Sequence, residues 1–599
     1  MVSKVRVVKT YPIDMAYHDV VNYYMFLRKI CVQKDGKPHN YWALVESYRT
    51  ERGPRQRVVA YLGEMDEAGR LGVENAAEGH PAIQDSLFED TTAEWVEVDV
   101  RRVRTERSRR FGDVWLALEL LKKLGLTGLF ERLMPSTRPK ISWSDVASVL
   151  VIARFCEPSS ELHIAEHFYR TSGLSDLLGI AEDDIYENRL YRALDELVVH
   201  KDDVQRYLKE RLGELFEIKY DILLYDVTST YFEGKAEKNP QARRGYSRDS
   251  RPDCKQVCIG LVVTREGIPL GYEVFEGNKH DSKTVQAIVE RMEAIYGKSE
   301  RIWIMDRGMV SPDNLRLVGA EGRRYIIGTP KSQLRKFEQH LVDKDWREVH
   351  DGLEVKLCPS PEGTEEIFIL CRSAARKKKE EAMHNRFADR INEGLERVRK
   401  SCESGRVKTV NVAERRIGRL LQENQRASSL FEISVKEEDG HVQVDWTKHT
   451  NDTDWARISE GCYLLRTNIK DWTPQELWRA YIQLTEAEEA FRIQKHDLQL
   501  RPIWHQKENR VKAHIFVCFM AYVLWKCFGQ MCKNAELGDE PRQVIEEIKN
   551  LTLTDVVLPT RKGTEIRLRC INRPDKHLAI LLHKLRMQPP LRLQQNQIL

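Results

Sequence analysis

The distribution of apolar and polar positions divides the chain into segments of different periodicity. Between residues 111 and 218, apolar side chains recur at helical spacing, as in the stretch VWLALELLKKLG that begins at Val114. Gly125, Pro135 and Gly173 interrupt the pattern. Because glycine and proline end or bend helices, the segment predicts a domain of several short helices.

Ahead of this segment the pattern is that of strands. Residues 40–63 form two apolar-rich runs around the turn Glu51–Pro54, which predicts two strands of a small β module within residues 1–75. Residues 76–110 are interpreted as a linker and a basic arm, in which six of ten positions from 101 to 110 are arginine. Such a run is typical of a solvated face and is also compatible with an arm that contacts phosphates.

From residue 219 strands alternate with helices. The stretch DILLYDVTSTYFEG from Asp221 is apolar on both sides of a strand except at Asp226. Two further strands follow around a hairpin turn at Arg265–Gly267, and the strand RIWIM then ends on Asp306, just before a helix that begins at Ser311. This order predicts an α/β sheet with Asp226 in its middle and Asp306 on the adjacent strand.

The segment between Asp306 and the next core elements is longer than an α/β core requires, so residues 333–455 are predicted to be an insertion. It contains the strand-like runs VKLCPS, EIFILCR, FEISVK and HVQVDW around a basic helical stretch, Ala374–Arg399. That stretch is either a grip on nucleic acid or a solvated arm. Residues 219–332 and 456–530 would form the core, and 531–599 a C-terminal region.

Thr473–His496 is predicted to be one long helix. Thr473, Pro474 and Glu476 have the spacing of a capping box with proline at the first position. At roughly 100° per residue, Tyr481, Glu488 and Lys495 fall within about 40° of one another, and Arg492 flanks the same face. Glu486 and Glu489 are turned away from that face, and Glu489 is the fallback if Glu488 is not the residue used. Taken alone, the pattern is also that of a solvated charged face.

The acidic positions indicate a metal site more strongly together than each does alone. Asp226 or Asp306 alone is compatible with a strand-end cap or a buried salt bridge, because an aspartate in an apolar strand needs a partner. With Glu488 they make three hard oxygen ligands, a set suited to Mg²⁺ or Mn²⁺.

These three motifs resemble the Asp, Asp and Glu of DDE insertion-sequence transposases. The similarity is greatest to the insertion-sequence-four group, in particular its branch numbered sixteen thirty-four. The signature of that group is Tyr, two residues, Arg, three residues, Glu, six residues, Lys. Tyr481, Glu488 and Lys495 fit this spacing, whereas Leu484 stands at the arginine position and Arg492 is the candidate replacement. The resemblance covers about residues 221–514.

The resemblance implies a ribonuclease-H-like catalytic core with a β-rich insertion, preceded by the small β module and a helical DNA-binding domain. It implies a transposase that cuts the ends of a mobile element and joins them to target DNA. Asp226, Asp306 and Glu488 would be catalytic and would hold two Mg²⁺ or Mn²⁺ ions per active site. The residues expected to hold DNA phosphates are Tyr481, Arg492, Lys495 and Arg307.

The implied partners are double-stranded DNA, as terminal inverted repeats and target, and a second copy of the chain in a homodimer on DNA. Two alternatives remain open. One is a metal-dependent nuclease of the same fold that cuts DNA without joining it, and the other is a non-catalytic DNA-binding protein derived from a transposase. Terminal inverted repeats flanking the gene would favour transposition over both.

Composition adds limits. Lys plus Arg is 96 and Asp plus Glu is 92, so any DNA-binding surface must be local. The 12 cysteines include no CxxC pair, which favours reduced thiols over a zinc site. The start has no signal-peptide pattern, and the longest apolar run, Ile515–Trp525, is too short to span a bilayer. We therefore expect a cytoplasmic protein without a membrane partner, associated with the nucleoid when bound to DNA.

Overall fold

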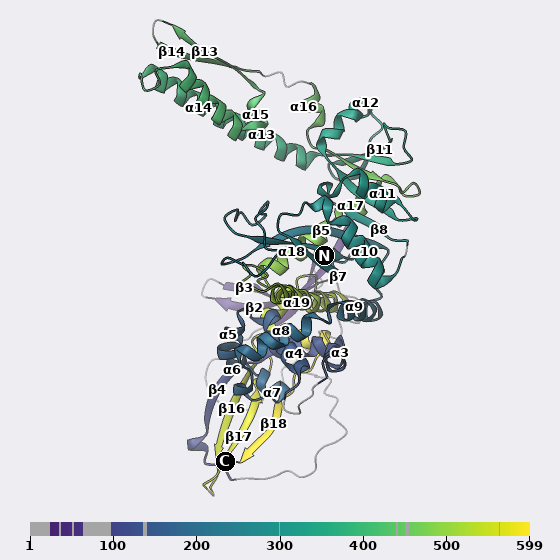
Figure 1. Cartoon of the computed structure of the whole chain (residues 1–599). Helices are drawn as coiled ribbons and strands as arrows, with labels where there is room; N and C mark the ends of the chain where they lie inside the picture. Colours follow the sequence, from purple (N-terminus) through teal and green to yellow (C-terminus); the bar gives the residue numbers. More distant parts are fainter. Residues whose placement is uncertain are drawn as a thin grey trace.

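The computed structural model describes residues 24–34, 37–50, 53–63, 97–135, 141–298, 300–438, 441–449, 454–561 and 563–598. The described elements form an elongated arrangement of layers (Figure 1). A helical arm lies at one end, a large sheet and a helical bundle form the middle, and a small sheet lies at the other end.

The central element is a nine-stranded mixed sheet with the order β10-β11-β12-β15-β9-β8-β5-β6-β7. Strands β5, β8 and β9 are parallel to one another, and the remaining neighbours are antiparallel. The chain is therefore an α/β protein built on a large mixed sheet. The strands are β5 (Ile222–Tyr231), β6 (Gln256–Val263), β7 (Pro269–Glu276), β8 (Ile302–Met305), β9 (Arg324–Thr329), β10 (Arg347–His350), β11 (Leu353–Pro359), β12 (Ile367–Ser373) and β15 (Cys462–Thr467).

Alternate residues of β5 pack into two different cores. Leu223 and Tyr225 belong to a core that includes the apolar stripe of α10 (Val285–Tyr296), whose five residues Val285, Ile288, Val289, Met292 and Ile295 are buried. Ile222 and Leu224 face a larger core that includes α18 (Thr485–His496). Because Asp226 has the same parity as Leu224, it lies on the face of the sheet that α18 covers.

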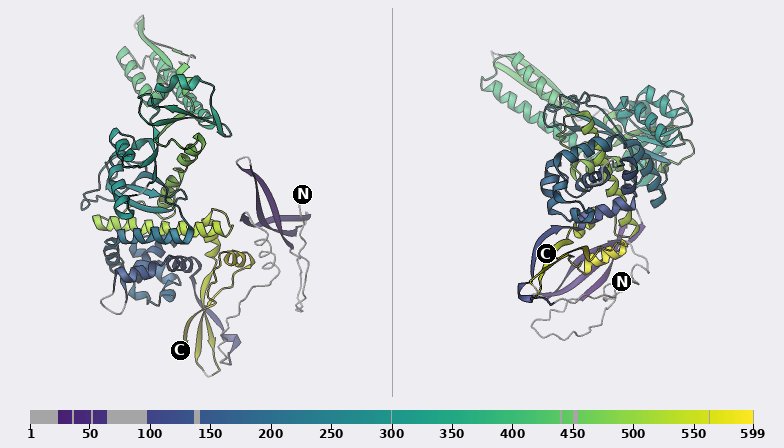
Figure 2. Two further views of the ribbon diagram at one scale, coloured as in Figure 1. Left: turned by 90° about the vertical axis from the view of Figure 1, so that its right-hand side faces the viewer. Right: turned by 60° about the horizontal axis from the view of Figure 1, so that its bottom comes forward.

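Helix α19 (Glu508–Asn534) joins the sheet to the helical bundle. It contacts α4 and α8 of the bundle on one side and α18 and β7 on the other, and it crosses the molecule between these two layers (Figure 2, left). Among the described residues, α19 is the one helix that is long enough and apolar enough to cross a membrane. However, 78% of its most apolar window is buried inside the protein. The apolar run Ile515–Trp525 is thus a core segment.

The bundle contains short helices, as the interrupted pattern predicts. It packs in the same large core as α19. Its elements are α2 (Gly112–Lys123), α3 (Leu126–Leu133), α4 (Trp143–Cys156), α5 (Glu161–His163), the π-helix η2 (Ile164–Phe168), α6 (Tyr169–Thr171), α7 (Leu174–Leu178), α8 (Glu187–Val198) and α9 (Lys201–Phe216).

The segment predicted as an insertion is divided between two places. Strands β10 to β12 join the central sheet through β15. The remainder forms the protruding arm, which has a small apolar core of its own (Figure 1, top). The arm comprises α13 (Ala374–Glu403), α14 (Val410–Glu423), α15 (Gln425–Ser428), β13 (Phe431–Glu438) and β14 (His441–Lys448).

The arginine run is neither a solvated face nor a free arm throughout. Residues 104–110 form β4, the edge of a four-stranded sheet with order β18-β17-β16-β4. Arg109 is buried and pairs with Asp176 and Asp555. Three more of its arginines, Arg104, Arg107 and Arg110, also have carboxylate partners. The other strands are β16 (Thr552–Pro559), β17 (Glu565–Ile571) and β18 (Arg592–Ile598), and α20 (Pro541–Ile548) and α21 (Lys576–Lys584) lie nearby in the chain.

The N-terminal β module has one strand more than the pattern predicts. Strands β1 (Tyr24–Lys34), β2 (Lys37–Thr50) and β3 (Gly53–Gly63) form an antiparallel sheet in sequence order. The predicted turn falls between β2 and β3, and two of its residues, 51 and 52, lie outside the described residues.

Candidate active site

Asp226 and Asp306 lie on adjacent parallel strands at the same level of the sheet. In the register of β5 and β8, Tyr225 is opposite Met305, so the residue that follows each of them is an aspartate. Asp306 follows the last residue of the strand and occupies the N-cap position of the short helix η5 (Arg307–Met309), where its side chain makes no capping hydrogen bond. The predicted helix after it begins at Ser311, whose side chain accepts a hydrogen bond from Asn314 N in α11 (Pro312–Gly319). The strand order thus brings the two carboxylates together as predicted.

The stretch Thr473–His496 is two helices, which corrects the prediction of one. Helix α17 (Pro474–Ile482) begins with the predicted capping box at Thr473, and α18 begins at Thr485. Between them the backbone makes hydrogen bonds of three-residue spacing, such as Glu486 N to Gln483 O at 2.8 Å. The Thr485 hydroxyl also donates to the Ile482 carbonyl. The regular rotation of about 100° per residue that the prediction assumed is therefore interrupted at Leu484.

Three glutamates near the start of α18 differ in their partners. Glu486 pairs with Lys526 at 3.4 Å, and Glu489 pairs with Arg492. Glu488 has no ion-pair partner among the described residues. It lines a cavity of about 890 Å³ together with Asp306 and Tyr481. Of the three, Glu488 is the one available to a ligand beside the aspartates.

The charges of the three acids affect the pKa values of Asp226 and Glu488. Desolvation by burial, followed by the charges of Asp306 and Glu488, raises the pKa of Asp226 to about 7, although the amide of Val227 and the charge of Arg248 act in the opposite direction. Desolvation and the charge of Asp306 likewise raise the pKa of Glu488. Each shift includes another member of the trio as a cause.

The donor set fits a divalent cation. Within the part of the chain that the structure describes, no lysine, arginine or histidine forms an ion pair with Asp226, Asp306 or Glu488. Three carboxylates that repel one another and lack a protein counter-ion are most stable with a hard cation between them. Carboxylate oxygens are the ligands that Mg²⁺ and Mn²⁺ prefer.

The position of Tyr481 depends on a glycine. A Cβ on Gly328 of β9 would lie 2.5 Å from the Tyr481 hydroxyl oxygen and 3.0 Å from Arg307 N. Only a residue without a side chain allows the tyrosine to approach the backbone beside Asp306 so closely. Burial and the charge of Asp306 raise the pKa of Tyr481, so its hydroxyl remains protonated and can donate a hydrogen bond.

The four residues expected to hold DNA occupy different environments. Arg307 is exposed and lines the same cavity as Asp306 and Glu488. Arg492 is half exposed and pairs with Glu489. Lys495 does not share the cavity but pairs with Asp249 at 2.8 Å, where both side chains are buried. Burial lowers the pKa of Lys495, and Asp249 opposes this shift.

Several residues that sequence reasoning missed surround the acids. Lys331 and Arg376 line the cavity together with Arg307, and all three also line a second cavity of about 890 Å³ at the base of the arm. Arg248, which lowers the pKa of Asp226, donates to both oxygens of Asp281 at 2.6 Å. These residues come from loops and from the start of α13, for which the periodic pattern carries no signal.

His514 has a packing role in this arrangement. Its ring is buried and lies 3.3 Å from a nitrogen of Arg154 and 3.2 Å from the carbonyl oxygen of Leu500. It therefore packs the segment after α18 against the bundle.

Comparison with known proteins identifies the family. The family described as transposase DDE domain matches residues 217–524, just over half of the chain, and the N-terminal domain of IS1634 family transposases matches residues 27–84. No curated protein matches the chain. A solved structure of a piggyBac transposase synaptic complex with hairpin DNA is similar at 8% identity and a TM-score of 0.35, over 76% of this chain and 82% of that chain.

The match to the transposase DDE domain contains all three acids of the candidate site, from Asp226 to Glu488. The second match places the β module in the N-terminal domain of one particular branch. The chain therefore belongs to the DDE transposases, as a member of the IS1634 family of insertion-sequence transposases, and it is a DNA transposase.

Proposed function

We propose that this transposase cuts the ends of a mobile element and joins them to target DNA with Asp226, Asp306 and Glu488 as its catalytic, metal-holding residues. The observation that supports the proposal is that Asp306 and Glu488 line one cavity and Asp226 lies beside Asp306 at the same level of the adjacent strand. Among the described residues, none of the three carboxylates has an ion-pair partner. The sheet with parallel β5, β8 and β9 would be a ribonuclease-H-like core, covered by α18.

The proposed metal is Mg²⁺ or Mn²⁺, two ions per active site, held by these carboxylates. When bound, such ions activate the attacking oxygen and stabilise the leaving oxygen of a phosphodiester. The chain's own residues keep the carboxylates in place. Asp226 is fixed within β5, Asp306 at the end of β8, and Glu488 in the first turn of α18.

The cations on the cavity walls would hold the DNA backbone. Arg307, Lys331 and Arg376 lie where the active-site cavity continues to the base of the arm, so a strand with one phosphate at the acids would pass beside them. Arginine and lysine contacts to phosphates position a duplex without reading its sequence. The protonated hydroxyl of Tyr481 would donate a hydrogen bond to the same strand.

The two basic residues of α18 would have different roles. Arg492 is exposed beyond the cavity and remains a proposed phosphate contact, because its partner Glu489 is also exposed and the pair is cheap to break. Lys495 would instead position the end of α18. It links the helix to Asp249, which also pairs with Arg501.

The proposed partners are double-stranded DNA, as terminal inverted repeats and as target, and a second copy of the chain, because two ends must be joined in one event. The proposed location is the cytoplasm, with nucleoid association through DNA. The proposed domain limits are those of the sequence analysis, with residues 111–218 as the helical DNA-binding domain, except that strands β10 to β12 of the predicted insertion belong to the central sheet.

The test is a reaction with DNA that carries the ends of the element, target DNA and Mg²⁺. We expect cleaved ends and products in which the ends are joined to target, and we expect neither product with Asp226→Asn or Asp306→Asn. Both variants should still bind the ends, since each removes an anion and no phosphate contact. Cleavage without joining would support the nuclease alternative, and normal cleavage by either variant would refute the assignment of these aspartates.

A further inference from the structure

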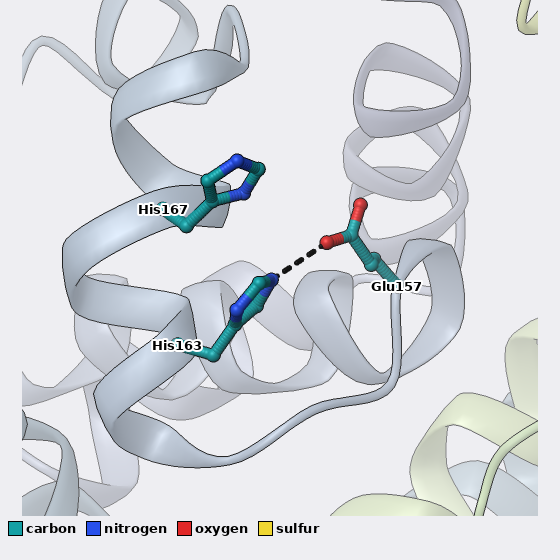
Figure 3. Close-up of side chains that lie close together, drawn as sticks. All are labelled: Glu157, His163 and His167. Carbon is teal, nitrogen blue, oxygen red and sulfur yellow. Dashed lines mark hydrogen bonds and ion pairs between the residues drawn. The ribbon is translucent and has the colours of Figure 1, made fainter.

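A cluster of two histidines and a glutamate lies in the helical bundle, outside the candidate active site. Glu157 follows the last residue of α4, His163 ends α5, and His167 lies in the π-helix η2 that continues from α5. One ligand atom from each lies within 4.8 Å of the others. Figure 3 shows the imidazole of His163 directed at the carboxylate of Glu157, with His167 one turn further along the same helix.

We propose that Glu157, His163 and His167 bind a zinc ion. Two imidazoles and one carboxylate are a donor set used by Zn²⁺ with three protein ligands, and the fourth position is then taken by water. Imidazole nitrogen is a poor ligand for Mg²⁺, so the site differs in metal preference from the three carboxylates of the candidate active site. The inference does not rest on the proposed function.

The histidines have the spacing and placement that a metal site needs. His163 and His167 are four residues apart on one helical face, and their rings stack at 4.8 Å between centroids with 29° between planes. The π-helical turn begins just after His163 and contains His167, and such turns are frequent at functional sites. His167 is exposed, so an ion bound at this site would be accessible to solvent.

The carboxylate is held in place for this role. Glu157 Oε1 lies 2.8 Å from Nε2 of His163, while Oε2 pairs with Arg110. Arg110 is itself fixed by Asp113 and by the carbonyl of Cys156. A partner that orients a metal ligand is a usual part of a metal site.

The place of the site in the fold suggests what the metal would do. Glu157 and His163 flank the turn that leads from α4 to α5, and an ion bound to both would close that turn. Glu161 lies within the same turn of helix, and its carboxylate contacts Nε2 of His505, in the segment after α18, at 3.2 Å. The metal would therefore stabilise a junction between the bundle and the catalytic core.

The test measures zinc retained by the full chain after dialysis in excess Mg²⁺, with Asp226→Asn in every sample to weaken binding at the active site. We expect one Zn²⁺ per chain, with loss of that ion in His163→Asn and in His167→Asn. The loss of affinity should exceed the roughly 10–100-fold that removal of a ligand's partner costs. Addition of Zn²⁺ should also raise the melting temperature of the parent protein and not that of either variant.

The control is His449→Asn, which removes the histidine of another exposed histidine–glutamate pair, that of His449 and Glu432 at 3.2 Å. Zinc content should not change in this variant. Circular dichroism establishes that each variant is folded. The proposal is overturned if the parent retains no zinc, if the His167→Asn variant retains as much as the parent, or if His449→Asn loses zinc to the same extent.

Discussion

The hydroxyl of Tyr481 lies against the backbone of Gly328, at a point where a Cβ would be 2.5 Å from its oxygen. The contact joins α17 to β9 next to Asp306. Gly328 and Tyr481 line the cavity that Asp306 and Glu488 also line.

We predict that Gly328→Ala slows single-turnover cleavage by about 100-fold, because displacement of catalytic groups by about 1 Å has an effect of that size. The double variant Gly328→Ala, Tyr481→Phe should recover part of the rate, since loss of the hydroxyl makes room for the methyl group. The control is Gly319→Ala, where the nearest side-chain atom to a Cβ is 3.5 Å away. Equal rates for Gly328→Ala and the parent would show that this contact does not position the site.

We predict that Asp226→Asn stabilises the metal-free protein. The pKa of Asp226 is raised to about 7, so between about pH 4 and 7 the folded state keeps a proton that the unfolded state has lost, and the contribution of this group to stability falls as pH rises. Above pH 7 the buried charge of Asp226 lowers the free energy of unfolding of the parent protein, and the Asn substitution removes that charge. Urea unfolding at pH 8 without divalent ions should give an increase on the order of 2 kcal/mol in the free energy of unfolding.

Mg²⁺ should reverse this order, because it stabilises the parent and not the Asn variant. Asp313→Asn is the control, since its carboxylate is highly exposed and pairs only with Arg316, one turn along α11. A variant that is less stable than the parent in the absence of metal at pH 8 would contradict the assigned pKa shift.

We predict that only one of the three glutamates at the start of α18 is essential. Glu488→Gln should abolish single-turnover cleavage, and Mn²⁺ should bind more weakly. Glu486→Gln and Glu489→Gln should remain active, because those carboxylates are occupied by Lys526 and Arg492. Activity in Glu488→Gln, with loss in Glu489→Gln, would mean that the third ligand is the neighbouring acid.

We predict opposite consequences for the two cations of α18. Lys495→Met should lower the free energy of unfolding, by less than the roughly 3–5 kcal/mol typical of a broken buried pair, because Arg501 still neutralises Asp249. The double variant with Asp249→Asn should recover stability. Arg492→Ala should leave stability almost unchanged and make the salt dependence of end binding shallower by about one counterion. A shallower salt dependence of end binding in Lys495→Met, with unchanged stability, would show instead that Lys495 contacts DNA directly.

We predict that the cavity at the base of the arm carries DNA. Arg376→Ala should weaken end binding and reduce the salt slope by about one counterion. The control Arg390→Ala changes another arginine of α13 that also lies over an aromatic ring, that of Phe387, but outside both cavities. Equal weakening by the two variants would place DNA along the whole arm instead of at its base.

The elements that sequence reasoning predicted are those specified by neighbouring residues. The hairpin at Arg265–Gly267, the capping box at Thr473 and the two strands that end near Asp226 and Asp306 depend on local spacing, and the structure contains them.

What could not be predicted depends on partners that are distant in sequence. Lys495 meets Asp249 across 246 residues, and no helical periodicity points to that pair. The break between α17 and α18 arises where Leu484 is buried, which requires knowledge of what the helix packs against. The arginine run has the composition of a solvated arm, and only its pairing with β16 shows that one of its members is buried.

The salt bridge between Arg109 and Asp555 has a consequence for the stability of incomplete chains. The two residues are 446 positions apart, and Asp176 of the helical bundle completes the buried group. During translation the bundle is synthesised long before β16. Arg109 can therefore pair with Asp555 only after most of the chain has been made. A chain that stops short of β16 would leave this arginine without its full complement of charge and β4 without its neighbouring strand. Interrupted synthesis is therefore expected to yield an unstable product that proteases remove, instead of a persistent fragment that occupies the ends of the element.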